Sequence, residues 1–540
     1  MFMVLIFMSM IFFYMDYLVI LEWMIFSFNS MNMEFIILLD WISLLFMSFI
    51  FLISSMIMLY SMVYMSGEKF LNRFNYLMLL FIFSMIFMVI SPNILSILFG
   101  WDGLGVVSYC LVMYYQTYTS YNSAMVTILC NRIGDVGILM SISMMMFMGG
   151  WNLVLCSSDM FLMFMMLVAA ITKSAQIPFS LWLPMAMAAP TPVSALVHSS
   201  TLVTAGVYLM IRFNKFLLES GLSFLLLILS VITMLMAGLM ANFEYDYKKI
   251  IALSTLSQLG FMMMILSMGH SVMAFYHLLI HAIFKSMLFM GAGVIIHSMK
   301  NTQDIRLLGN LNEIMPFTMM SLFISKMALS GVPFMSGFYS KDLIMELVYF
   351  SSFNVFMLIL IIMSLFFTVS YSVRMFYYLF FNNSVKFYSY MNFMENNLMN
   401  LSMMMMMMMS VILGSVMNWF FFFDYYVIYL SVEIKMMTLG CCILGLVMSM
   451  FMMMMSKILK FYYLLNFFST MFFMSSMFSW IYWPINLLGV KIYEFDKSWL
   501  EFLEKYLLLN FLIYKFNIYY KFHMFMFLFI YIVMFMNLFM

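Results

Sequence analysis

Long apolar segments, interrupted only by short polar stretches, run through almost the whole 540-residue chain. A transmembrane helix needs about 20 apolar residues, and most of these segments reach that length. They are too long and too uniformly apolar for the strands of a membrane barrel. Only 8% of the residues are charged, against about 25% in soluble domains. The sequence therefore predicts an all-α polytopic membrane protein with about 15 transmembrane helices, and it excludes soluble, disordered and nucleic-acid-binding proteins.

Prolines and glycines interrupt the apolar sequence at two places. Four prolines lie between residues 178 and 192, and Gly331, Pro333 and Gly337 lie near residue 335. Broken helices at membrane depth are tolerated only inside protein or along a water-filled cavity. In secondary transporters, paired interruptions in two halves mark the transport path. Two ordinary loops between spans are the alternative.

The two interruptions also resemble each other in sequence. Lys173 is followed by Ala175 and a Pro-Phe pair, and Lys326 is followed by Ala328 and a Pro-Phe pair. This pattern predicts two related, inverted-repeat bundles. We divide the chain into N-terminal spans (1–92, the first about 4–21), a first bundle (93–242, broken near 173–184), a second bundle (243–380, broken near 331–342), peripheral spans (381–490), an amphipathic lateral helix (491–521) and a terminal anchor span (522–540).

Charged residues return between Lys491 and Lys521, among apolar residues at close to helical spacing. Glu501 and Lys505 form a favourable i,i+4 pair. The segment is too charged to span a membrane, so we expect a helix that lies along a membrane or protein surface.

Ionisable side chains within the predicted spans are the best functional candidates. A charge at the bilayer centre costs at least ~2.5–3.5 kcal/mol, so it usually faces protein interior or water. Lysine and histidine can exchange protons with water and carboxylates. Sodium would need a cage of oxygen ligands, which the sequence does not reveal. We therefore predict a proton path formed by Asp102, Lys173, His198, Lys248, His277, His281, Lys285, Lys341 and Asp342.

Pairings within this set follow from spacing. Asp102 and Lys173 are the favoured ion pair, since a desolvated carboxylate needs a nearby cation. Arg132 and Asp135, at i,i+3, can neutralise each other in a structural or a functional pair. Lys341 and Asp342 form either a self-paired gate to solvent or a surface pair.

Other roles stay open for several members. His277, His281 and Lys285 share one helix face, and a metal site there lacks a third ligand. Lys173 is alternatively a snorkelling lysine, His198 a structural histidine and Lys248 an interface anchor.

Redox centres have no visible ligands in this chain. Its five cysteines form no CxxC or CxxCH motif, and there is no GxGxxG or Walker loop. We expect no cofactor and no metal on this chain.

Several of these segments resemble the family of NADH–ubiquinone oxidoreductase chain 5, the antiporter-like subunits of respiratory complex I. The resemblance is strong over about residues 100–345 and rests on the segments 100–105, 131–135, 173–201, 248–260, 277–290, 303–311 and 331–342. It implies a proton pump driven by remote electron transfer, with the acidic residue at Asp102 paired to Lys173. Asp102 stands where many relatives have Glu, and Lys326 matches no lysine of the family.

The resemblance also implies the surroundings of the chain. Flavin, iron–sulfur clusters and ubiquinone are expected on partner subunits, and the lateral helix is expected to brace other membrane-arm subunits in the mitochondrial inner membrane. A cation/proton antiporter subunit of the multisubunit bacterial type is the main alternative. A structural membrane scaffold is the second, although a scaffold would not need Lys173, His198 and Lys285 at depth.

Overall fold

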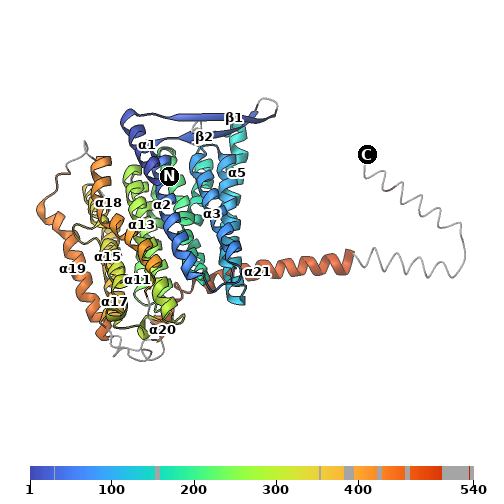
Figure 1. Ribbon diagram of the computed structural model, residues 1–540. Coiled ribbons are helices and arrows are strands. Elements are labelled where there is room, and N and C mark those ends of the chain that lie inside the picture. Colours follow the sequence, from blue (N-terminus) through green and yellow to red (C-terminus); the bar gives the residue numbers. More distant parts are fainter. Residues whose placement is uncertain are drawn as a thin grey trace, which may run out of the picture. The chain divides into compact units, whose positions relative to one another are not determined.

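The computed structural model forms two compact units, residues 1–471 and 472–540 (Figure 1). It describes residues 1–28, 31–152, 159–351, 354–381, 395–422, 428–455, 462–500 and 534. The predicted anchor span at 522–540, apart from Met534, and most of the predicted lateral helix lie outside the described residues.

The first unit is a helical bundle. Among the described residues, eleven segments are long and apolar enough to cross a membrane, so the protein is a multi-pass membrane protein. One of them is the composite segment Thr191–Arg212. The others are α2 (Trp41–Tyr64), α3 (Leu71–Ile90), α4 (Ile94–Val112), α5 (Tyr118–Phe147), α11 (Ser223–Ala241), α12 (Tyr247–Ser267), α13 (Ser271–Ser298), α17 (Val355–Phe380), α18 (Asn397–Phe422) and α19 (Val432–Met455).

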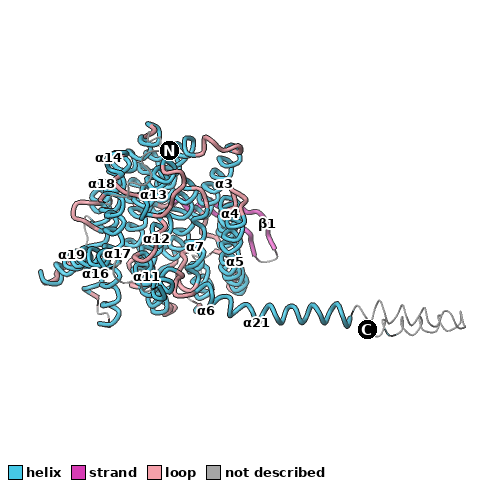
Figure 2. Tube along the Cα trace, turned by 90° about the horizontal axis from the view of Figure 1, so that it is seen from below, coloured by secondary structure: helices cyan, strands magenta, loops and turns pink. Residues whose placement is uncertain are grey.

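The middle of this bundle is formed by α12 and α13, which other helices surround in the view of Figure 2. The most apolar windows of both helices are completely buried inside the protein, whereas α17 and α18 bury 39% and 33% of theirs. A helix buried on all sides must pair its polar groups within the protein. Ionisable side chains in the middle of α12 or α13 therefore lie in the interior, whereas near the helix ends Lys249 is partly exposed and His297 is exposed.

The chain is interrupted at both of the proline- and glycine-containing places. At the first place, α6 (Met160–Lys173) ends before the prolines. Three short helical segments follow it: η2 (Phe179–Leu181), α7 (Trp182–Met185) and η3 (Ala186–Ala188). The path resumes in α8 (Thr191–Val193), the π-helical η4 (Ser194–Thr201) and α9 (Leu202–Arg212). Prolines cause this break because each lacks an amide donor and clashes with the preceding turn.

The second interruption separates α15 (Pro316–Ser330) from α16 (Ser336–Phe350). Gly331 ends α15 in the left-handed conformation, with φ of 81°, which glycine adopts without a Cβ penalty. Gly337, in the first turn of α16, packs so closely that an added Cβ would lie 1.8 Å from the carbonyl oxygen of Ala328. Lys341 and Asp342 lie within α16, one turn after the break.

The N-terminal region differs from the expected span at 4–21. The first helix, α1 (Phe2–Met15), has only 14 residues and ends at Asp16 in the left-handed conformation. An antiparallel hairpin of β1 (Val19–Phe28) and β2 (Met31–Leu39) follows, with Val19 opposite Leu39. The all-α prediction was wrong here, because aromatic and β-branched residues in this segment favour strands as readily as an apolar helix.

Shorter helices complete the first unit. They are α10 (Asn214–Glu219), η5 (Ile305–Leu307), α14 (Leu311–Ile314) and α20 (Tyr462–Ser469). In the second unit, α21 (Met474–Phe495) continues into a π-helical stretch, Asp496–Leu500. The helix therefore begins well before residue 491, where the amphipathic segment was predicted to start.

Candidate functional site

Lys173 is the last residue of α6 and is completely buried. Its Nζ donates to the carbonyl oxygen of Trp101 at 3.3 Å and lies 5.0 Å from the centre of the Trp101 ring. The backbone of α4 comes so close that a Cβ added at Gly105 would meet Nζ at 3.7 Å. The first helix break thus presents one lysine to the polar backbone of α4.

Asp102 does not form the predicted direct ion pair with Lys173. Its carboxylate pairs with Arg132 at 3.6 Å, and Arg132 also pairs with Asp135 at 3.1 Å, as the i,i+3 spacing predicted. The charges of both carboxylates act on Lys173, and the side chain of Asp135 is the more buried of the two, 10% exposed against 40% for Asp102. Arg132 therefore pairs with both carboxylates, and the buried Asp135 is screened less from Lys173 by solvent.

Asp102 and Arg132 also reach the outside of the bundle. Their side chains are 40% and 48% exposed, although each lies near the middle of a long apolar helix. The expectation that the carboxylate of Asp102 is desolvated was therefore wrong for this chain by itself. Charges at this depth are costly against lipid, so this face of α4 and α5 is suited to contact with protein or water.

His198 and Lys248 lie at the second half of the first break. His198 is buried in the π-helical stretch, 6.2 Å from Trp182 between ring centres. Neither of its ring nitrogens has a hydrogen-bond partner among the described residues. Lys248, in the first turn of α12, is buried and donates to the carbonyl oxygen of Ala189 at 3.1 Å. This contact ties the break to the central helix.

His277, His281 and Lys285 are all completely buried on α13. His277 contacts Ser340 through Nδ1 at 2.9 Å and Gln258 through Nε2 at 3.2 Å. These polar groups extend from α12 across α13 to α16, which joins the row to the helix that carries Lys341.

Three of the partners were absent from the predicted site. They are Gln258 and Ser340, which contact His277, and Ser254. Lys285 Nζ donates to Ser254 Oγ at 2.5 Å. Ser254 and Gln258 stand at i,i+4 in the middle of α12, a spacing that places both on one face. That polar pair was a usable sequence signal, whereas nothing in the sequence singled out Ser340.

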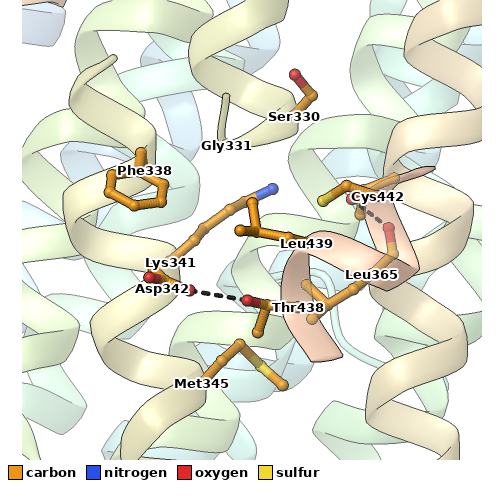
Figure 3. Close-up of a pocket in the computed structure, with 11 residues that line it drawn as sticks. Ser330, Gly331, Phe338, Lys341, Asp342, Met345, Leu365, Thr438, Leu439 and Cys442 are labelled. Carbon is orange, nitrogen blue, oxygen red and sulfur yellow. Dashed lines mark hydrogen bonds between the residues drawn. The ribbon is translucent and has the colours of Figure 1, made fainter. Parts of the chain in front are cut away.

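Lys341 and Asp342 are not paired with each other among the described contacts (Figure 3). Lys341 Nζ donates to the carbonyl oxygen of Leu329, and Asp342 Oδ1 accepts from Thr438 at 3.0 Å. Adjacent helical residues point in different directions, so the self-paired step was wrong. Both residues line a cavity of about 30 Å³, which has room for about two waters.

The groups on α13 and α16 are electrostatically linked. The charge of Lys341 acts on Lys285 and on both histidines, and Lys285 acts on both histidines as well. A proton gained at one position therefore disfavours a proton at the next. In the described part of the chain, no three His, Cys, Asp or Glu side chains are grouped so that they could hold a metal ion.

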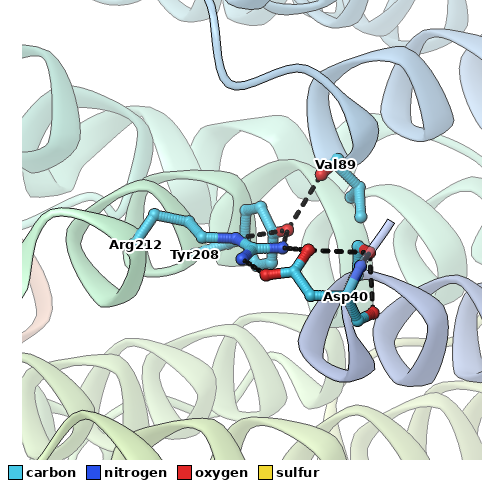
Figure 4. A network of polar contacts seen from close by, with 5 residues as sticks. Asp40, Val89, Tyr208 and Arg212 are labelled. Atoms are coloured by element: carbon cyan, nitrogen blue, oxygen red, sulfur yellow. Dashed lines mark hydrogen bonds and ion pairs between the residues drawn. The ribbon is translucent and has the colours of Figure 1, made fainter. Parts of the chain in front are cut away.

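A separate polar network joins Arg212 to Asp40 and Tyr208 (Figure 4). Tyr208 in turn donates to the carbonyl oxygen of Val89 at 2.9 Å. Leu18 and Leu38, at the ends of the hairpin, line a cavity of about 230 Å³ next to this network. Arg212, the last residue of α9, thus holds the ends of α2, α3 and α9 together.

Family models match nearly the whole chain. The model described as NADH:quinone oxidoreductase/Mrp antiporter, TM matches residues 91–368, complex I chain 5 N-terminus matches 23–75, and NADH dehydrogenase subunit 5 C-terminus matches 371–540. The NADH-ubiquinone oxidoreductase chain 5 of Anopheles gambiae is 48% identical, over 92% of this chain and 88% of the relative. This chain belongs to the NADH-ubiquinone oxidoreductase chain 5 family. The relative of the same name from Locusta migratoria is 47% identical over 92% of this chain and 89% of its own length.

The chain 5 family membership confirms the resemblance on which the functional prediction rests. Solved structures show the same fold. A chain of the Mrp complex from Dietzia superposes with a TM-score of 0.75 at 23% identity, covering 90% of this chain and 56% of that one. A chain of an archaeal membrane-bound sulfane sulfur reductase superposes with a TM-score of 0.62 at 21% identity, covering 76% and 83%. At these identities the likeness concerns architecture alone.

Proposed function

We propose that protons cross this chain along the buried row Lys173, His198, Lys248, His277, His281, Lys285 and Lys341, with Asp102 and Asp342 at its two ends. Family membership makes the chain a proton-translocating, antiporter-like membrane subunit. The observation that carries the assignment of the row is the burial of four ionisable residues on α12 and α13: Lys248, His277, His281 and Lys285.

The chemistry of the row suits proton transfer better than ion binding. Its members are amines and imidazoles, which bind a proton directly, whereas a sodium site needs several oxygen ligands. On α13 and α16, Lys285 and Lys341 interact with each other and with both histidines. Protonation of Lys285 therefore favours release of a proton from Lys341, because like charges repel strongly in a low-dielectric interior.

The row extends through both halves of the bundle. Asp102, Asp135 and Arg132 surround the Lys173 end, and α13 and α16 carry the other end. Lys248 bridges the two through Ala189. A scaffold could fold without this arrangement, since well-packed apolar residues of similar volume often replace a complete group of buried charges without loss of stability.

The setting follows from the relatives' printed names. We place this chain in the membrane part of an NADH–ubiquinone oxidoreductase complex in the mitochondrial inner membrane. Flavin, iron–sulfur clusters and the quinone site belong to partner subunits. The half-exposed Asp102–Arg132 face of α4 and α5 is proposed to contact a partner, and the helix beginning at Met474 is proposed to reach others along the membrane.

The test is Lys285→Met in the intact complex, reconstituted into proteoliposomes. We expect fewer protons transferred per NADH oxidised, because the substitution removes one proton-binding group and keeps the side-chain volume. Lys326→Met is the matched control, since Lys326 is a buried lysine of α15 outside the row. An unchanged ratio in Lys285→Met, with the complex fully assembled, rejects the row. A sodium-dependent ratio supports the antiporter alternative.

A further inference from the structure

One face of α19 borders the pocket of Lys341. Lys435, Thr438, Leu439 and Cys442 stand at i, i+3, i+4 and i+7, so they lie on the same side of the helix. The last three line the small cavity that also contains Lys341 and Asp342 (Figure 3). This face was not singled out by the sequence and is not part of the proposed row.

Two polar contacts hold that face against α16. Thr438 Oγ1 donates to Asp342 Oδ1 at 3.0 Å, and Lys435 Nζ pairs with Glu346 Oε1 at 3.2 Å. Asp342 and Glu346 are one turn apart on α16, and their partners are one turn apart on α19. The two pairs therefore form a short ladder between the helices beside the cavity.

Away from α16, the closest packing of α19 is on α17, where a Cβ added at Gly445 would lie 2.9 Å from the carbonyl oxygen of Phe366. Only 11% of the most apolar window of α19 is buried in this chain, and Lys435 and Glu346 are partly exposed at 46% and 20%. Partly exposed ion pairs contribute little to stability. The contact between α19 and α16 thus depends on a few polar atoms and can open without unfolding either helix.

The cavity between the two helices has room for about two waters, with its volume of about 30 Å³. Lys341 Nζ stays bonded to the carbonyl oxygen of Leu329 at the end of α15. Leu439, from α19, lies beside the Lys341 side chain in Figure 3. A longer water chain to Lys341 from the α19 side therefore requires α19 to move away from α16.

We propose that the α19 face of Lys435, Thr438, Leu439 and Cys442 is a gate that controls water access to Lys341. Thr438 is the positioning residue, because it holds Asp342 turned toward α19 in the closed state. When the ladder opens, water replaces the Thr438 hydroxyl at Asp342 and reaches the lysine. The gate lets Lys341 exchange protons with water, so this proposal rests on the proposed function.

The test uses Cys442 as a built-in reporter in the intact complex without NADH. Cys442 lines the cavity and is only partly exposed, so a membrane-impermeant methanethiosulfonate reagent modifies it slowly in the closed state, and a faster rate reports opening. We expect Thr438→Val to raise that rate several-fold and Thr438→Ser to keep it near the native rate. Ser449→Ala is the control, because that α19 hydroxyl donates only to Leu446 of its own helix at 2.7 Å. Cys441 does not line the cavity and provides the reference in the same peptide.

A second variant and a second readout keep the gate falsifiable. Glu346→Gln removes the charge from the other half of the ladder and so weakens it, and it is expected to raise Cys442 modification as well. In proteoliposomes, Thr438→Val is expected to lower the steady pH gradient while NADH oxidation continues, which is the sign of a leak. Equal modification rates in native, Thr438→Val and Glu346→Gln complexes overturn the gate.

The outcome is separable from that of the proposed function. Modification is measured without turnover, so it reports the movement of α19 even if no proton passes Lys341. Conversely, a lowered proton ratio in Lys285→Met with unchanged Cys442 modification in Thr438→Val retains the row and removes the gate.

Discussion

Each lysine of the row makes a single direct hydrogen bond among those the structure describes. Lys173, Lys248 and Lys341 donate to backbone carbonyls, and Lys285 donates to a hydroxyl. A charged ammonium has three donors, and leaving them unsatisfied in the interior is costly. These sites therefore suit a neutral amine that takes a proton when water or a neighbouring carboxylate supports it.

Lys326 allows the cost of such a lysine to be measured outside the row. It is 4% exposed, and its Nζ has no hydrogen-bond partner among the described residues. Lys326→Met removes the unsatisfied donors and keeps the volume, so we expect stabilisation of about 1–3 kcal/mol with proton transfer unchanged. Thermal dissociation of the complex measures the first and the proton-to-NADH ratio the second. A loss of proton transfer would place Lys326 in the path.

Asp135 is the residue at which the structure most changes the predicted site. Since the side chain of Asp135 is only 10% exposed against 40% for Asp102, solvent screens its charge less, and Asp135→Asn is expected to lower the proton-to-NADH ratio more than Asp102→Asn. Both substitutions keep the side-chain shape and remove one negative charge near Arg132. The opposite order of the two variants would restore the pair predicted from sequence.

At the scale of single residues, the sequence identified the ionisable groups and missed most of their partners. Charges in apolar segments stand out, so Lys173 and Lys285 could be found directly. The Asp102–Lys173 pairing failed because contacts between α4, α5 and α6 depend on packing that spacing does not reveal. Trp101 acts through its backbone carbonyl, and no side-chain pattern reports that.

Helix breaks are the elements that bring the row together. Both were visible in the sequence because proline removes a donor and Gly331 adopts the left-handed conformation. The hairpin at Val19–Leu39 was not visible, since apolar residues occur on both of its faces and the hydrophobic pattern resembles a span. The ends of α6 and α15 place Lys173 and the acceptor of Lys341 at the two breaks.

The packing of the second break is testable at Gly337. Gly337→Ala would put a Cβ 1.8 Å from the carbonyl oxygen of Ala328, so α16 must shift, which costs about 1–3 kcal/mol. We expect a lower dissociation temperature of the complex and slower proton transfer, because the shift moves Lys341. Gly440→Ala on α19 is the control, as nothing lies within 4 Å of its added Cβ. Equal behaviour of the two variants would show that the break tolerates displacement.

For the molecule as a whole, composition established the class, and burial supports the proposed path. An 8% charged chain can only be a membrane protein, and the family models extend over residues 23–75, 91–368 and 371–540. Which apolar helices lie at the centre could not be predicted, since α12 and α13 are no more hydrophobic than α2 or α11. The polar residues of these two helices can be recognised as interior groups only when the helices that surround them are known.

The side chains of the row must be connected by water, because the ring nitrogens of His198 and His281 have no hydrogen-bond partner among the described residues. The most direct measurement is an electron cryo-microscopy map of the intact complex in lipid, at a resolution that shows ordered water. We predict waters bonded to the ring nitrogens of both histidines and a continuous chain of waters and side chains from Lys173 to Lys341. Apolar side chains packed without water between these residues would contradict the account.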